Sequence, residues 1–263
     1  MRLEAISTTD LAICSALVLA LALLNLRHSP DLAKGLVIGM VRLILQLSLI
    51  AIVLKTVFEH ASLWSTVLIS VVMMLLAGRE VAARQQTKLA QGWTLSISIF
   101  AMTSTSTLLI LLALLALVQP APWYTPQYAI PLLGMILGNT LNSVSLSMDR
   151  LVDSARLSRT AIEAQLMLGA SRKAAIAPLV RQAMHSGMMP SINGMAAAGI
   201  VSLPGMMTGQ ILAGASPETA VRYQILIFLL IVAGAAMGAW LATRLTVWRL
   251  FDERDRLRLD RLA

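Results

Sequence analysis

The chain is short of charged residues. Asp, Glu, Lys and Arg make up 13% of its 263 residues, about half of the roughly 25% that is typical of a soluble domain. Hydrophobic residues make up 57% of the chain, and the mean hydropathy is +0.77. Because the apolar residues come in long blocks and not in a short period, the sequence predicts an all-α polytopic membrane protein.

Cysteine and the motifs of catalysis are equally scarce. Cys14 is the single cysteine, so the chain forms no internal disulfide and no cysteine-based metal motif. No Gly-Lys pair occurs, which excludes a P-loop able to hold ATP, and the zinc-protease, serine-hydrolase and dithiol motifs are absent. We therefore expect no catalytic residue, no cofactor and no enzymatic activity.

Seven apolar segments are long enough to cross a bilayer, which takes about 20 helical residues. The predicted spans are residues 10–26, 36–57, 63–82, 94–118, 128–148, 185–213 and 222–245. We expect one transmembrane domain over residues 1–263, with a cytoplasmic loop at 149–184 and a cytoplasmic tail at 246–263. The tail alternates acids with arginines, which predicts a solvated or surface-lying helix.

The basic residues indicate the orientation. The net charge is +8, but most of the 21 Lys and Arg residues fall in loops on one side of the predicted spans. These residues are Arg27, Lys34, Arg79, Arg84, Lys88, Arg150, Arg156, Arg159, Arg172, Lys173, Arg181, Arg244, Arg249, Arg254, Arg256, Arg258 and Arg261. The positive-inside rule then places the N-terminus outside and the C-terminus in the cytoplasm. The same rule accounts for the basic charge, so we expect a lipid bilayer and no nucleic acid as partner.

Two pairs of polar side chains lie within predicted spans. Arg42 and Gln46 are four residues apart on the second span, and Asn139 and Asn142 are three apart on the fifth, so each pair shares a helix face. Polar groups in hydrocarbon need partners and often mark a transport pathway. We expect the two asparagines to point into the bundle, as part of either a substrate pathway or the packing; for Arg42, snorkelling to the membrane surface is the structural alternative.

The sixth segment contains a predicted break. Residues 185–213 make a helix longer than a core of ~30 Å requires, and Pro204 removes a backbone donor next to Gly205. We expect the helix to break near residues 202–205. Because broken helices recur at transport sites, Pro204, Gly205, Met206 and Met207 are candidates for a substrate pathway. Met206 and Met207 follow the break; their thioethers suit either irregular packing, which is favoured, or a soft metal ion.

Glycine pairs spaced four apart occur in several predicted spans. They are Gly35 and Gly39, Gly134 and Gly138, Gly205 and Gly209, and Gly234 and Gly238. Such pairs let helices approach closely in lipid. Packing within one chain is the favoured reading, and a homodimer interface is the alternative.

One charged loop has a distinctive pattern. Glu163 and Ala164 are followed by Gly169, and Ala170, Ser171 and Arg172 come directly after it. This pattern resembles the coupling loop of ABC-transporter permeases, in which Glu-Ala-Ala precedes a Gly at the same spacing. Gln165 stands here in place of the second Ala, and Pro178 comes earlier than the family's Leu-Pro. The resemblance implies a short helix that docks on a separate cytoplasmic ATPase subunit.

Over its whole length the chain resembles the Fet-type (FetB-like) iron-export ABC permeases. The stretches that carry this resemblance are residues 41–47, 134–139, 168–171 and, above all, 199–214. It implies a homodimeric permease in the bacterial inner membrane that exports iron or a related metal. Plant relatives are linked to aluminium tolerance and to nucleotide sugar. A nucleotide-sugar exporter, a stand-alone secondary transporter and a non-transporting scaffold are the alternatives, and no metal ligand is assigned because the spans hold no acidic cluster.

Overall fold

The computed structural model describes residues 7–262, and regular structure there is almost entirely helical. The helices are α1 (Thr8–Asn25), α2 (Pro30–Glu59), α3 (Leu63–Arg84), α4 (Trp93–Leu112), α5 (Pro126–Leu157), α6 (Arg159–Met167), α7 (Arg172–Ala197), α8 (Gly205–Leu212) and α9 (Pro217–Leu250). A π-helical turn, Ala113–Val118, extends α4, and a short 3-10 turn, Leu259–Arg261, lies in the tail. This composition confirms the all-α polytopic fold.

Six of these helices are long and apolar enough to span a bilayer: α1, α2, α3, α4 with its π-helical turn, α5 and α9. They coincide with six of the seven predicted spans. The remaining predicted span, residues 185–213, is the interrupted one, and it consists of the second half of α7, a non-helical stretch and α8. Seven predicted crossings therefore correspond to six continuous helices and one broken segment.

The chain divides into two compact units. The first consists of the residues up to Ala61 together with Leu212–Gly214, and the second of Ser62–Ile211 together with the residues from Ala215 onward. In the first unit α1 and α2 pack against each other. Ser7 begins α1 through a capping box, in which its hydroxyl accepts from the Thr9 N–H and its own N–H donates to Asp10.

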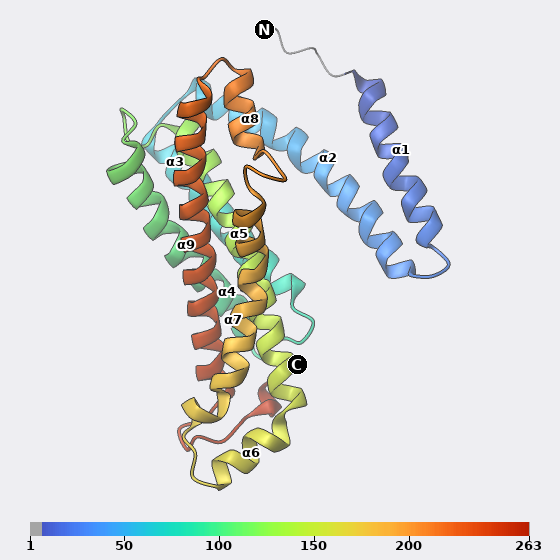
Figure 1. Ribbon diagram of the computed structural model, residues 1–263, viewed down its shortest axis with the longest axis vertical. Coiled ribbons are helices and arrows are strands. Elements are labelled where there is room, and N and C mark those ends of the chain that lie inside the picture. The colour runs from blue at the N-terminus through green and yellow to red at the C-terminus, as the bar shows by residue number, and fades with distance from the viewer. Residues whose placement is uncertain (1–6, 263) are drawn as a thin grey trace. The chain divides into compact units, whose positions relative to one another are not determined.

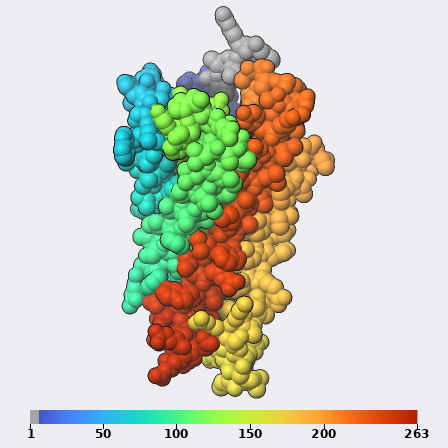
Figure 2. Space-filling model, turned by 90° about the vertical axis from the view of Figure 1, so that its left-hand side faces the viewer, coloured from blue at the N-terminus to red at the C-terminus, as the bar shows by residue number. Residues whose placement is uncertain are grey.

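The second unit is a bundle organised around α5. Helix α5 packs against α3, α4, α7 and α9, and α9 also contacts α4 and α7. Figure 1 shows these five helices running roughly along one another, with α6 across one end. Figure 2 shows α9, in red, beside α4, in green, on one face of this unit, with the yellow α6 at its lower end.

Small residues set the spacing within this bundle. A Cβ atom added to Gly187 of α7 would lie 1.9 Å from Ser147 Oγ of α5. One added to Gly234 or Gly238 of α9 would lie within 3 Å of Thr140, also on α5. This confirms packing within the chain for the pair Gly234 and Gly238, because close backbone approach is what holds helices together in lipid.

The predicted break is present, and it begins earlier than the sequence indicated. Helix α7 ends at Ala197, residues 198–204 are not helical, and α8 begins at Gly205. The turn starts at Gly199, whose φ is +83°, and its N–H donates to the Ser202 carbonyl at 2.9 Å. Pro204 ends the interruption, and its carbonyl accepts from the Thr208 N–H at 3.1 Å at the start of α8.

The tail is not the helix that its charge pattern predicted. Helix α9 ends at Leu250, and the following residues fold back along the end of the second unit. Phe251 is buried, and the Ala90 N–H donates to the Arg261 carbonyl at 2.7 Å. Alternating charges indicate that a segment is exposed to solvent, but they do not determine its backbone conformation. The few apolar residues of the tail pack individually against the second unit.

Loops that were predicted on the same side lie at the same end of this unit. The α3–α4 loop touches the tail through a bridge between Leu89 and Leu262, and Arg172 at the start of α7 pairs with Asp255 at 3.4 Å. The basic loops thus gather at one end of the second unit, as the alternation of spans requires.

Candidate functional site: the α6 corner and the polar face of α5

Helix α6 forms a short arm at the basic end of the second unit. Most of the predicted loop 149–184 is helical, because α5 continues to Leu157 and α7 begins at Arg172. Ile162 is the buried side chain of α6 and fastens it to the bundle. On the outer side, Glu163 accepts from Arg159 Nε at 2.8 Å, an i, i+4 pair that favours the helix.

The corner after α6 explains the Leu-Gly-Ala-Ser pattern residue by residue. Gly169 has a φ of +89°, its N–H donates to the Leu166 carbonyl at 3.0 Å, and the Ala170 N–H donates to the Gln165 carbonyl at 3.0 Å. These two bonds define a Schellman motif with Gly169 as the left-handed residue. Ser171 then caps α7, since its Oγ accepts from the Ala174 N–H at 3.3 Å.

Two apolar side chains stand exposed at the end of α6. Met167 is 83% exposed and Leu168 is 89% exposed, although both lie in a charged region outside the apolar helices. A single exposed apolar residue is ordinary, but two adjacent ones at the tip of a rigidly capped corner form a defined apolar knob. Such a knob is suited to insertion into a groove of another protein.

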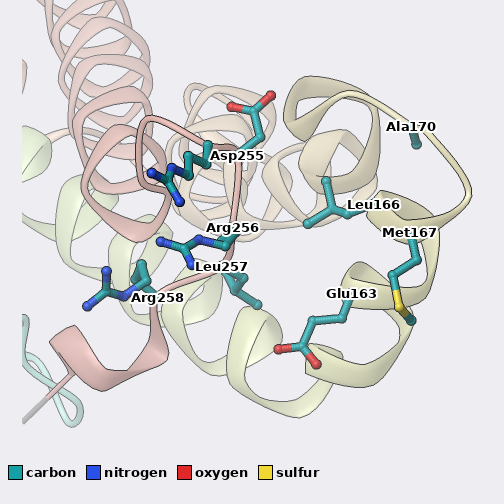
Figure 3. Close-up of a pocket in the computed structure, with 9 residues that line it drawn as sticks. Glu163, Leu166, Met167, Ala170, Asp255, Arg256, Leu257 and Arg258 are labelled. Atoms are coloured by element: carbon teal, nitrogen blue, oxygen red, sulfur yellow. The ribbon is translucent and has the colours of Figure 1, made fainter.

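A cavity of about 800 Å³ separates α6 from the tail. Figure 3 shows Glu163, Leu166 and Met167 on one side and Asp255 to Arg258 on the other. Leu166 and Leu257 point toward the space between, whereas the guanidinium groups of Arg256 and Arg258 point away from α6. The α6 arm and the tail therefore form the two sides of one cavity.

Carboxylates hold the tail in its fold. Asp252 Oδ1 accepts from the N–H groups of Arg254 and Arg256 at 3.0 and 2.9 Å. These backbone hydrogen bonds lower the pKa of Asp252. Asp260 accepts two hydrogen bonds from Arg258, which lower its pKa to about 2. Both groups thus stay ionised at neutral pH, and their hydrogen bonds hold turns within the tail.

The structure places Asn139 and Asn142 on an exposed face of α5, not inside the second unit. The expectation that they point into the bundle is wrong for this unit, because Thr140, Ser143 and Ser147 occupy its interior instead. Asn142 Oδ1 accepts from Arg84 at 3.0 Å, and Arg84 Nε pairs with Glu80 at 3.3 Å. A polar stripe therefore runs along the outer side of α3 and α5.

The other predicted pathway residues lie on other elements, namely the start of α8 in the second unit and α2 in the first unit. Met206 packs against the core of the second unit and Met207 is buried. Gly205 is exposed at the start of α8. Arg42 and Gln46 lie on α2 of the first unit, both exposed. Within residues 7–262, no three His, Cys, Asp or Glu side chains gather to hold a metal ion.

Sequence reasoning missed the apolar knob and the packed tail. The signal for the knob is present, because Met167 and Leu168 are apolar residues directly before a helix-ending glycine in a polar loop. The tail carries a weaker signal, since Phe251, Leu257 and Leu262 are isolated among charges. Their burial depends on the distant α3–α4 loop, which no local pattern reveals.

The helices and the long apolar faces define a polytopic helical membrane protein. Within that class, residues 8–251 match the model of a family described as "Uncharacterised protein family (UPF0014)". The match covers most of the chain, and this protein belongs to that family.

Relatives in bacteria and plants agree with this assignment. The UPF0014 membrane protein slr1647 of Synechocystis is 41% identical, over 82% of this chain and 83% of the relative. Protein ALUMINUM SENSITIVE 3 of Arabidopsis thaliana is 31% identical, over 88% of this chain and 83% of the relative. The probable iron export permease protein FetB of Escherichia coli is 28% identical, over 98% and 97%. No solved structure matches the chain.

Proposed function

We propose that this protein is the membrane permease subunit of an ABC exporter, driven by a separate cytoplasmic ATPase. The observation that carries the proposal is the α6 corner. It is a short helix fastened by Ile162, ended by Gly169 and followed by a capped α7, with Met167 and Leu168 exposed at its tip. These are the physical requirements of a lever that transmits movement between two proteins.

The length of α5 supports the lever. Helix α5 runs from Pro126 to Leu157 and continues into α6 with a change of direction at Ser158. A force applied to α6 therefore reaches the middle of the bundle, where α5 contacts α3, α4, α7 and α9. Movement of a rigid element against its neighbours is how alternating access works in transporters.

The substrate is proposed to be iron or a related metal ion, which is exported. Support comes from the name of the Escherichia coli relative, the probable iron export permease protein FetB. The candidate pathway residues are Arg42, Gln46, Asn139, Asn142, Pro204, Gly205, Met206 and Met207. The permease would act as a homodimer, and the localisation would be the bacterial inner membrane.

The proposal is tested by affinity purification of the tagged protein from its native membrane. The variant Met167→Asp/Leu168→Asp places charge on the knob and should reduce co-purification of a nucleotide-binding protein by about tenfold or more, as loss of central interface residues does. A control, Gln86→Asp/Lys88→Asp, adds the same residues to the exposed α3–α4 loop at the same end of the unit.

Wild-type protein and the control should retain the ATPase equally. If wild-type protein brings down no nucleotide-binding chain, the ABC assignment fails, and a secondary transporter driven by an ion gradient becomes the better account. If both variants lose it equally, α6 has no special role. If the substrate is a non-metal such as a nucleotide sugar, the purified complex should contain the ATPase, but added metal ions should not change its rate of ATP hydrolysis.

A further inference from the structure

A second hollow lies between α7 and α9, and its lining includes Arg172 at the start of α7. It has a volume of about 430 Å³. Its floor is apolar and is made by Ile176, Ala177, Val180 and Val247, and its rim carries four basic side chains. The basic residues are Arg172, Lys173, Arg181 and Arg244. No acidic side chain lines it within the described part of the chain.

Two tryptophans complete the rim. Trp240 is 53% exposed and Trp248 is 57% exposed, and the Arg244 guanidinium lies 5.5 Å from the centroid of the Trp240 ring. Tryptophan is enriched where the hydrocarbon core meets the headgroups. An exposed Trp beside Arg on an apolar helix is therefore typical of the headgroup level of a membrane.

The position of Trp240 along α9 also indicates the headgroup level of the membrane. Helix α9 begins at Pro217, and Trp240 lies about 35 Å further along its axis at 1.5 Å per residue. A hydrocarbon core is about 30 Å thick. The rim of the hollow therefore emerges where the core ends, on the side with the basic loops, and its apolar floor extends toward the core.

We propose that this hollow is a binding site for an anionic phospholipid of the inner leaflet. The phosphodiester would lie among Lys173, Arg181 and Arg244, while one acyl chain follows Ile176, Val180 and Val247 between α7 and α9. Basic pockets between transmembrane helices on the cytoplasmic side are suited to such headgroups. Arg172 takes a smaller part, because it pairs with Asp255 at 3.4 Å.

Charge favours a lipid over a second copy of the chain at this face. A two-fold interface brings the same patch of both subunits together, which would oppose two sets of basic side chains. A phosphodiester supplies the opposite charge, and its chain covers the apolar floor. The proposed lipid site requires only that the chain is a membrane protein, so its test does not depend on the proposed ATPase partner.

Native mass spectrometry of the full chain in detergent tests the site. We expect phosphatidylglycerol to be retained over phosphatidylcholine with the same acyl chains. The variant Lys173→Gln/Arg181→Gln/Arg244→Gln should lower retention of phosphatidylglycerol by ~10-fold or more, since each basic residue contributes to the attraction. The matched control, Lys88→Gln/Arg150→Gln/Arg156→Gln, removes the same charges from exposed positions elsewhere at this end and should leave retention unchanged.

A second variant separates a built site from general charge attraction. Ala177→Trp keeps every charge but fills the apolar floor, so it should also weaken retention of phosphatidylglycerol. Binding of glycerol 3-phosphate, which has no acyl chain, should be no stronger in this variant than in wild-type protein. The proposal is overturned if wild-type protein shows no preference between the lipids, or if the control loses as much retention as the triple variant. It is also overturned if glycerol 3-phosphate competes fully, or if the triple variant dissociates a dimer without changing lipid retention.

Discussion

At the scale of single residues, the α6 corner depends on one backbone conformation. Gly169 has a φ of +89° and its added Cβ would meet no other atom within 4 Å, so the constraint is conformational and not steric. An L-residue in this left-handed region raises the conformational free energy by roughly 1–2 kcal/mol. The increase is largest for β-branched residues, whereas Asn adopts this region more readily. Substitutions here therefore form a graded series.

The first prediction follows from that series. Gly169→Val should distort the corner and lower the proposed ATPase-dependent export by about tenfold or more, while Gly169→Asn keeps most of it. Export is measured as the fall in cell iron after loading, with the amount of inserted protein compared in parallel. Equal export by the Val and Asn variants would show that the left-handed corner has no part in coupling.

A second residue-scale prediction concerns packing between α5 and α7. Gly187→Ala should destabilise the bundle by about 1–3 kcal/mol, because its Cβ would lie 1.9 Å from Ser147 Oγ and 2.7 Å from the Ser143 carbonyl oxygen. Gly194→Ala in the same helix makes an ordinary contact of 3.4 Å with Phe228 and should be close to neutral. Thermal unfolding in detergent compares the two; similar midpoints would contradict the packing described.

At the scale of elements, sequence and structure agree best where the signal is local. The apolar helices, the break before Pro204 and the sharp exit at Gly169 were all predictable, since each depends on nearby residues. The close approach at Gly187 was not, because it has no partner glycine four residues away and depends on α5. The predicted orientation of Asn139 was wrong for the same reason. A polar side chain in a span needs partners, but its sequence does not say on which side they lie, and Thr140 and Ser143 are the polar residues of α5 that are buried here.

The tail provides the element-scale prediction. Asp252→Ala removes the acceptor for the Arg254 and Arg256 N–H groups, so trypsin should cut the tail roughly five- to tenfold faster at neutral pH, as local opening exposes the backbone. Glu253→Ala, at an exposed neighbouring position, is the control. Identical cleavage of both variants and of wild-type protein would mean that Asp252 does not hold the tail.

Acid should have a related effect, and its direction follows from the lowered pKa values. Asp260 has a pKa of about 2 in the fold, below its ordinary value of 3.8. Its contribution is present above that ordinary value and is lost as the pH falls from about 4 toward 2. The pair of Arg258 and Asp260 is therefore expected to persist throughout the physiological range.

At the scale of the whole molecule, the account rests on which end faces the cytoplasm. In a Cys14→Ser background, a cysteine at Ala121 in the α4–α5 loop should react with a membrane-impermeant maleimide in intact cells. A cysteine at Glu253 in the tail should react only after permeabilisation. Both positions are exposed, so accessibility of the side chain does not decide the result. The reverse pattern would invert the topology and place α6 outside, where no ATPase could reach it.

The most direct test of the central claim is photo-crosslinking at the α6 knob in living cells. A photoreactive residue at Met167 should capture a soluble nucleotide-binding chain, identified by mass spectrometry. The same residue at Trp64, an equally exposed position at the start of α3, should capture lipid or membrane proteins instead. Capture of the ATPase from Met167 alone is the result that we predict. Failure to capture it from Met167 at normal protein levels, or equal capture from Trp64, would contradict α6 as the coupling element.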